Sequence, residues 1–167
     1  MPDSERQLGV IKDILLPLDK STRYDVYFTD KRIAIVCMGH SRHVDDGVVP
    51  SRSFLFGIAP EALPSEQKRN PQTIDEEINS FSLDEKLKLS KKSCFYTYDE
   101  IEGAKMILGP KPKFIILSKE CESKFIPDEE QFKQLCEILP KIDALRSKFS
   151  IAGNWHLLQE IFTASFK

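Results

Sequence analysis

The chain has 167 residues, a hydrophobic content of 41%, a charged content of 30% and a formal net charge of −2. These values are typical of a folded globular protein; they disfavour a largely disordered chain, and they disfavour nucleic acid as a partner because phosphate binding depends on clustered Lys and Arg. The sequence has no apolar run of about 18 residues and its N-terminus, MPDSERQLGV, is charged, so we expect a cytoplasmic protein that does not cross a membrane.

The N-terminal part of the chain predicts three strands. Residues 9–18 are apolar and branched, and Pro17 disfavours a helix through them. In residues 23–38, RYDVYFTDKRIAIVCM, apolar side chains recur at every second position on both sides of a polar run at 29–32. This pattern predicts an antiparallel hairpin whose turn lies at residues 29–32.

A long insertion is expected between the two groups of strands. Residues 59–92 are rich in proline at their start and then show two helix-start signals. Thr73 with Glu76, and Ser82 with Glu85, match the capping box, in which a side-chain oxygen and a carboxylate satisfy free amides at a helix start. The insertion is therefore predicted to carry two short helices.

Four short apolar segments follow, at residues 94–97, 101–108, 113–117 and 121–126. The connections between them are brief, and a connection of that length cannot make the crossover that parallel strands require. The segments therefore predict an antiparallel meander.

An amphipathic helix is predicted after residue 127. Pro127 and the acidic residues behind it suit a first helical turn. An apolar stripe follows at i, i+3, i+4 and i+7, formed by Phe132, Leu135, Cys136 and Leu139. Pro140 is expected to kink or restart this helix, and the same spacing continues to Phe149.

The last residues, 150–167, predict a further helical extension. Trp155, Leu158, Ile161 and Phe162 share one helical face. This face either packs on the rest of the chain or is covered by another subunit or protein, because large exposed apolar patches usually mark contacts.

The order of these elements resembles a pleckstrin-homology-like domain of the bacterial PH and GRAM group. The segment YFTDKRIAIV is similar to the hairpin pattern Y-x-T-[DN]-x-R-[LI]-x-[LIVF], and FYTYDEIEGAKM is similar to the pattern I-P-Y-x-x-I-x-x-[VAI]. The resemblance covers residues 9–58 and 93–140. The long insertion and the residues after 140 depart from the pattern.

The resemblance implies an α+β fold: an antiparallel barrel of about seven strands, capped by a C-terminal amphipathic helix. We expect this domain to span residues 9–149, with the insertion at 59–92 and a helical extension at 150–167. Members of the bacterial group mostly lack an assigned activity, whereas eukaryotic relatives bind phosphoinositides or peptides. Fold alone assigns neither function to this chain.

Basic residues near the loop between the first two strands are the candidate lipid site. Lys12, Lys20 and Arg23 occupy positions comparable to those that phosphoinositide binders of this fold use. Each basic residue near an anionic membrane contributes about 1 kcal/mol, so three are too few for stable membrane residence without a specific pocket. Neighbouring acidic residues would offset part of this attraction, and an ordinary solvated loop is the competing interpretation.

The four cysteines are expected to be free thiols, because the sequence contains no CxxC pair and a reducing compartment is expected. Cys37, His40 and His43 supply ligand types that zinc accepts. Their spacing matches no common structural site, so a buried thiol followed by a polar loop is favoured and no cofactor is predicted.

No catalytic residues are assigned. Cys94 or Cys121 could pair with His156, but no activating neighbour is visible for either thiol, and the common nucleotide-binding and hydrolase motifs are missing. We expect a binding module that acts through protein contacts, with self-association as one form of them. Peripheral binding of anionic lipid and a small enzyme of unknown chemistry are the alternatives.

Overall fold

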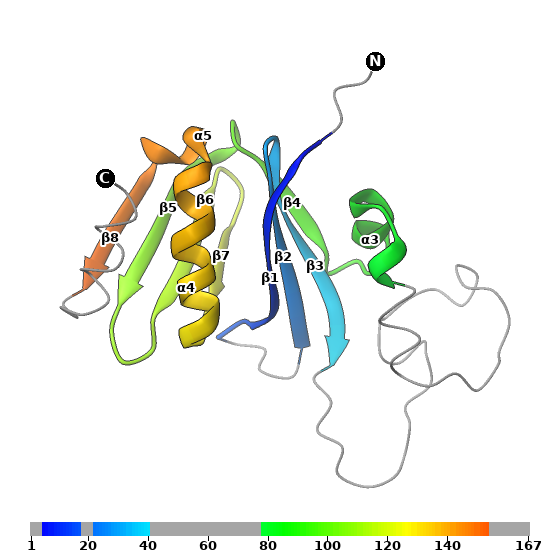
Figure 1. Cartoon of the computed structure of the whole chain (residues 1–167), viewed down its shortest axis with the longest axis horizontal. Coiled ribbons are helices and arrows are strands. Elements are labelled where there is room, and N and C mark those ends of the chain that lie inside the picture. Colours follow the sequence, from blue (N-terminus) through cyan, green and yellow to red (C-terminus); the bar gives the residue numbers. More distant parts are fainter. Residues whose placement is uncertain (1–4, 18–21, 41–77, 154–167) are drawn as a thin grey trace, which may run out of the picture.

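The computed structural model describes residues 5–17, 22–40 and 78–153 (Figure 1). The strands are β1 (Gln7–Leu15), β2 (Thr22–Thr29), β3 (Arg32–His40), β4 (Cys94–Thr97), β5 (Ile101–Leu108), β6 (Lys113–Ser118), β7 (Glu122–Phe125) and β8 (Phe149–Gly153). The helices are α3 (Leu83–Lys88), α4 (Glu129–Ile138) and α5 (Asp143–Arg146), with a 3-10 turn at Leu139–Lys141 between the last two. The protein is therefore an α+β chain.

The first sheet has the order β1-β2-β3-β4, and all of its pairings are antiparallel. The predicted hairpin is confirmed: Val26 lies opposite Ile35 and Phe28 lies opposite Ile33, so the apolar alternation of both strands falls on one face. At the turn, the Arg32 N–H donates to Oγ1 of Thr29 at 2.9 Å.

The second sheet has the order β7-β6-β5-β8. β5, β6 and β7 form the antiparallel meander predicted for them. The prediction was wrong about β4, which pairs with β3 in the first sheet instead of joining this meander. The reason is the turn between β4 and β5, which carries the chain from one sheet to the other without a hairpin (Figure 1).

The helix predicted to continue to Phe149 is also corrected by the structure. α5 ends at Arg146, and Phe149–Gly153 forms β8, which pairs in parallel with β5. Lys148 fixes this change of direction, because its Nζ donates to the carbonyl oxygens of Tyr98 and Ile101 at 2.8 Å each. Residues 150–153 are thus strand, and the rest of the predicted helical extension lies outside the described residues.

The predicted C-terminal helix, α4, covers the open side between the two sheets (Figure 1). Asp128 caps its N-terminus in a capping box with Gln131, and all four residues of the predicted stripe are buried. The Gln131 side chain also donates to the Lys12 carbonyl oxygen at 2.7 Å. The helix is therefore tied to β1 by a hydrogen bond as well as by apolar packing.

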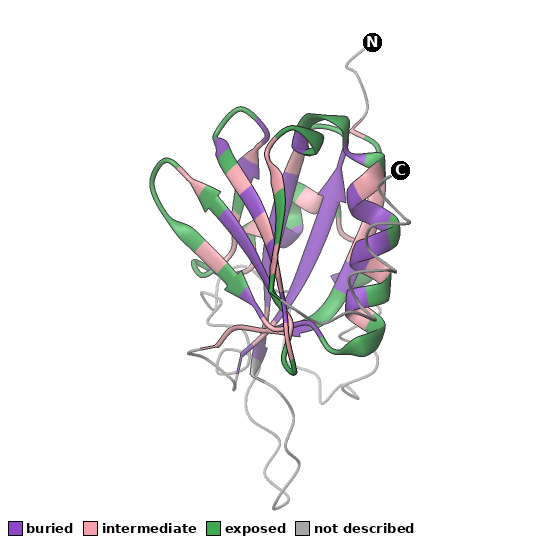
Figure 2. Ribbon diagram, turned by 90° about the vertical axis from the view of Figure 1, so that its left-hand side faces the viewer, coloured by how far each residue is buried: buried purple, intermediate pink, exposed green. Residues whose placement is uncertain are grey.

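One apolar core joins both sheets and α4. Phe114 of β6 lies with its ring centroid 6.3 Å from Phe28 of the first sheet and 6.2 Å from Phe125 of the second. Figure 2 shows the buried residues on the strands and on the inner face of α4, and the exposed residues mainly at the strand ends and turns. The two sheets are thus packed face to face over a shared interior.

The described strands do not form a closed barrel. The two sheets meet through a single isolated bridge, in which Leu15 pairs with Ile126 just after β7. On the opposite side, between β4 and the β6–β7 region, side-chain contacts join the sheets instead of a ladder. The predicted seven-stranded barrel is therefore replaced by two four-stranded sheets in the part of the chain that the structure describes.

Candidate functional site

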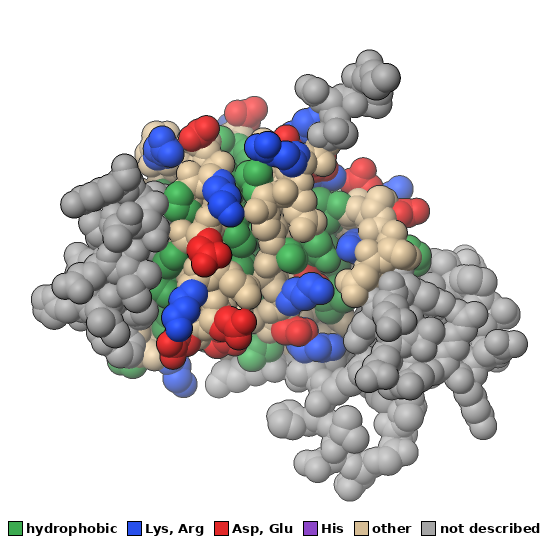
Figure 3. All heavy atoms as spheres, in the orientation of Figure 1, with side chains coloured by type: hydrophobic (Ala, Val, Ile, Leu, Met, Phe, Trp, Pro, Cys, Tyr) green, Lys and Arg blue, Asp and Glu red, His purple; other side chains and the backbone are tan. Residues whose placement is uncertain are grey.

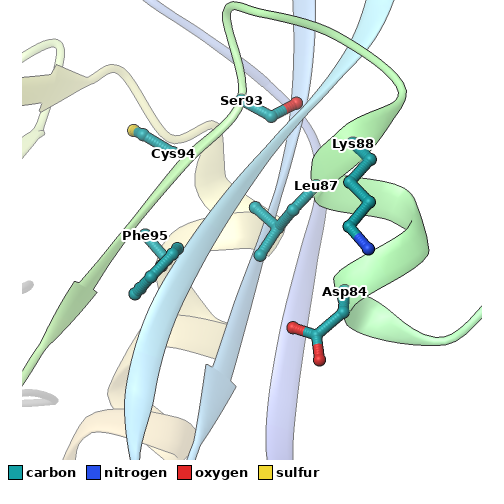
Figure 4. A pocket seen from close by; sticks show the side chains of 6 residues that line it. All are labelled: Asp84, Leu87, Lys88, Ser93, Cys94 and Phe95. Carbon is teal, nitrogen blue, oxygen red and sulfur yellow. The ribbon is translucent and has the colours of Figure 1, made fainter.

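A shallow hollow of about 600 Å³ lies between α3 and β4. It is lined by Asp84, Leu87 and Lys88 from α3 and by Ser93, Cys94 and Phe95 from the start of β4 (Figure 4). Its walls combine apolar side chains with one acidic and one basic group. This composition suits a neutral, largely apolar ligand with a few polar contacts.

α3 forms one wall because it packs on the outer face of the first sheet. Leu83 and Leu87 contact a small second cluster that includes Tyr27, Ala34 and Val36. A capping box between Ser82 and Glu85 fixes the start of the helix. The predicted second helix of the insertion is thereby confirmed, whereas most of the first lies outside the described residues.

A buried lysine, Lys86, attaches α3 to the first sheet through contacts with Tyr27 of β2. The Lys86 Nζ lies 3.3 Å from the Tyr27 hydroxyl and 5.0 Å from the centroid of its ring, a geometry that allows a hydrogen bond and a cation–π contact. Burial lowers the pKa of Lys86 and raises the pKa of Tyr27 to about 12. The lysine holds the helix in place beside the hollow and lies outside its lining.

Phe95 is the most exposed large apolar side chain of the described residues, at 47%. Strand alternation turns its neighbour Tyr96 into the core and leaves Phe95 on the outer face, opposite Ala34. The Arg32 guanidinium lies 5.0 Å from the Phe95 ring centroid. One side of the ring is thus stacked on a cation while the rest is open to a ligand.

Arg32 connects three parts of the molecule at this point. Its guanidinium donates to both oxygens of Glu5 at 2.8 Å each and also forms an ion pair with Asp84 of α3. The hydrogen bond from Arg32 lowers the pKa of Glu5 more than burial raises it. The side chain therefore holds one rim of the hollow by fixing α3 and Phe95 relative to the start of β1.

β4 is an edge strand of the first sheet: within residues 5–17, 22–40 and 78–153, no strand pairs with its outer edge. The Thr97 N–H donates to Oε2 of Glu100 at 2.9 Å and its carbonyl oxygen accepts from the Glu100 N–H at 3.0 Å, so Thr97 faces away from β3. Alternate residues of a strand direct their backbone groups to the same edge. The N–H and C=O of Phe95 therefore also face the free edge, next to the hollow.

Lys12 and Arg23, the two candidate lipid residues that the structure describes, both lie close to acidic side chains. Lys12 lines a second hollow, between β1 and α4, in which Asp13, Asp128 and Glu130 supply three carboxyl groups. Arg23 is paired with Asp13 at 2.7 Å, and Lys20 lies outside the described residues. The lysine and arginine that the structure shows are thus surrounded by negative charge, which opposes attraction to an anionic surface.

The weak metal candidate is not assembled by the described residues. Cys37 is buried on β3 among the core residues, and its N–H donates to the Ser93 Oγ at 2.9 Å. His40 ends β3, and His43 lies outside the described residues. Within residues 5–17, 22–40 and 78–153, no three His, Cys, Asp or Glu side chains are placed to hold a metal ion.

The candidate protein-contact face at Trp155, Leu158, Ile161 and Phe162 lies outside the described residues, as does His156. The hollow at β4 was not predicted from the sequence. The one available signal was the segment CFYT, in which two aromatic residues are consecutive. A strand would place one of them on each of its two faces. A phenylalanine on the solvent face of an edge strand has that signature, although a strand buried on both faces has it too.

The molecule thus belongs to the class of two-sheet α+β proteins, with a helix closing one side of the core and an open strand edge beside an amphipathic hollow. No family model, curated protein or solved structure matches the chain. No helix in the described part of the chain combines the length and apolar character needed to span a membrane. On the face seen in Figure 3, acidic and basic side chains alternate without a large area of one sign.

Proposed function

We propose that the chain is a non-enzymatic binding module that docks an extended segment of a partner protein along the edge of β4. The observation that carries this proposal is the coincidence of three features: an unpaired strand edge, an exposed phenylalanine and an adjoining hollow. In strand addition, backbone hydrogen bonds supply affinity, and pockets for alternate side chains supply specificity.

The chemistry of the hollow indicates what the partner segment contains. Leu87 and Phe95 offer apolar contacts, while Asp84 and Lys88 carry opposite charges and nearly balance. Arg32 is already neutralised by Glu5 and Asp84. A partner segment with alternate apolar side chains and little net charge therefore fits this surface better than a strongly charged one.

A pleckstrin-homology-like architecture is proposed for the fold. Four strands in one sheet, a three-stranded meander and then an amphipathic helix on the core follow the order that the resemblance implies. The parallel strand β8 and the single bridge between the sheets depart from it. This proposal concerns fold and supports the binding function by analogy alone.

The experiment selects short random peptides against the immobilised chain and then measures their affinity for two variants. Phe95→Lys places a charge on the proposed contact. Ile151→Lys is the matched control, because Ile151 is also an exposed apolar residue on an edge strand. Removing one buried phenylalanine contact should weaken binding at least about tenfold.

The expected result is a loss of affinity in Phe95→Lys alone and slower hydrogen exchange of the Phe95 amide when the peptide is bound. Peptides that bind both variants equally, or protect a different strand, would contradict docking at β4. Dimerisation of the chain that disappears in Phe95→Lys would identify a second copy as the occupant, since two β4 edges can pair about a twofold axis.

Binding of anionic lipid through Lys12, Lys20 and Arg23 stays a prediction. Co-sedimentation with anionic and neutral liposomes tests it, using the Lys12→Ala/Arg23→Ala variant as the comparison. The acidic neighbours of Lys12 lead us to expect no difference between the two kinds of vesicle.

A further inference from the structure

Two cysteines, one on β4 and one in the turn between β6 and β7, meet at the hydroxyl group of Tyr96. The Tyr96 oxygen lies 3.0 Å from the Cys121 Sγ, 2.9 Å from the Ser123 Oγ and 3.8 Å from the Cys94 Sγ. Cys94 and Tyr96 belong to β4, whereas Cys121 lies in the turn just before β7 and Ser123 lies in β7. These contacts join the edge of the first sheet to the second sheet on the side where the ladder is open.

The remaining cysteines are in a different environment. Cys37 and Cys136 are buried in the main core, whereas Cys94 is half-buried and Cys121 is exposed. The accessible thiols are therefore the two that share the tyrosine hydroxyl. Since each sulfur contacts the same oxygen, the two thiols are close neighbours, and a disulfide requires both side chains to turn towards each other.

Cys121 lies in a tight turn that keeps its side chain at the surface. The Ser118 N–H donates to the Cys121 carbonyl oxygen at 2.9 Å, and the Cys121 N–H donates to the Ser118 Oγ at 3.2 Å. Burial raises the pKa of Cys94, so the exposed thiol of Cys121 is the better first nucleophile.

We propose that Cys94 and Cys121 are a thiol pair that forms a reversible disulfide on reaction with a low-molecular-weight disulfide such as oxidised glutathione. In the first step the Cys121 thiolate attacks one sulfur of that disulfide, forming a mixed disulfide and releasing one glutathione thiolate. The Cys94 thiol then loses its proton to water and attacks the Cys121 sulfur, releasing the second glutathione thiolate. The protein loses two electrons, which reduce one oxidised glutathione to two thiols.

This inference goes beyond the proposed binding function and does not depend on it. The disulfide would link β4 covalently to the turn between β6 and β7, across the side that lacks a backbone ladder. Because a cross-link restricts the unfolded chain, the oxidised protein should melt at a higher temperature than the reduced protein.

The experiment treats the reduced full-length chain with oxidised glutathione and then combines intact-mass measurement, peptide mapping and thiol titration. The expected product has lost two hydrogen atoms, has a Cys94–Cys121 peptide link, and titrates two of its four cysteines. Cys94→Ser should stop at a stable glutathione adduct on Cys121, and Cys121→Ser should give no cross-link. Dithiothreitol should restore all four thiols.

Mapping of the wild-type product decides the proposal even if a variant folds poorly. A product that stops at the mixed disulfide, or that contains Cys37 or Cys136 in its link, would overturn it. A loss of two hydrogen atoms that persists in Cys121→Ser would overturn it as well. If the oxidised wild-type protein melts at no higher temperature than the reduced protein, the disulfide does not stabilise the packing of the two sheets.

Discussion

Asp25 is a carboxyl group with only 3% exposure on β2. One of its oxygens accepts the N–H of Asp13 at 3.0 Å, and Asp13 has a positive φ of 56° at an irregularity of β1. Burial raises the pKa of Asp25, while Lys12 and Arg23 act more weakly in the opposite direction. The residue thus fixes a strained turn of the backbone but carries its negative charge in unfavourable surroundings.

The first prediction concerns this charge. Because the folded-state pKa of Asp25 lies above its ordinary value of 3.8, the folded protein binds the proton more tightly than the unfolded chain. Protonation therefore favours folding fully below about pH 4, and this contribution is lost as the pH rises through the folded-state pKa. Asp25→Asn keeps the acceptor for Asp13 and should raise the urea midpoint at neutral pH.

Urea denaturation of wild type and Asp25→Asn at a series of pH values measures this effect. The advantage of Asp25→Asn should be small below about pH 4 and should grow towards neutral pH. Asp99→Asn, at an exposed position, is the control and should follow the wild-type curve. An advantage of Asp25→Asn that is the same at every pH would show that charge is not its cause.

At the scale of elements, the docking of α4 on β1 depends on a glycine. The side chain of Ile138 lies directly above Gly9, and a Cβ added at Gly9 would overlap Cγ1 and Cδ1 of Ile138. The close approach lets the helix cover the end of the first sheet, and Ile138 stays buried there at 6% exposure.

The second prediction is that Gly9→Ala destabilises the protein by about 1–3 kcal/mol, because the added methyl group overpacks this contact. Chemical denaturation measures the change. Gly109→Ala is the matched control, since no atom lies within 4 Å of its added Cβ, and it should change stability by less than about 0.5 kcal/mol. In an Ile138→Ala background, Gly9→Ala should lower the free energy of unfolding by less. An equal loss in both backgrounds would mean that the contact with Ile138 is not the cause.

The sequence predicted the elements that can be recognised from the residue pattern within the segment itself. In the sequences of β2 and β3 apolar residues recur at every second position, and α4 has both a capping signal and a complete apolar stripe, so their positions follow from local pattern. β8 was missed because Ile142, Leu145 and Phe149 also fit helical spacing, and its parallel partner β5 lies more than 40 residues earlier. Sequence spacing does not show such a partner.

The candidate site was missed for a related reason. Whether β4 is a central or an edge strand depends on which sheet it joins, and the sequence favoured pairing with β5. The same limit applies to Cys94 and Cys121, which are far apart in the chain and meet only when the two sheets pack. Local patterns predict faces of elements, whereas sites that combine two sheets require the tertiary structure.

At the scale of the whole molecule, the two sheets share one core and should unfold together. Phe114, with 1% exposure, lies between Phe28 of the first sheet and Phe125 of the second. Its side chain therefore contributes to both sheets, although it belongs to β6. The separate backbone ladders do not imply separate folding units.

The third prediction is that Phe114→Ala lowers the free energy of unfolding by about 3–5 kcal/mol and lowers it equally for both sheets. Native-state hydrogen exchange should show the same loss of protection in β2 and β3 as in β5 and β6. Leu117→Ala, on the same strand at an exposed position, should cost about 1 kcal/mol or less. A loss of protection confined to β5 and β6 would mean that the sheets unfold independently.

The parallel pairing of β8 with β5 has a consequence for synthesis on the ribosome. β5 can pair with β6 as soon as both have emerged, but its other edge stays open until α4, α5 and then Phe149–Gly153 have been made. An open strand edge on a nascent chain is available for pairing with other chains. A translational pause before residue 149 would therefore leave one edge of β5 exposed to pairing with other chains. In the finished protein β8 covers this edge.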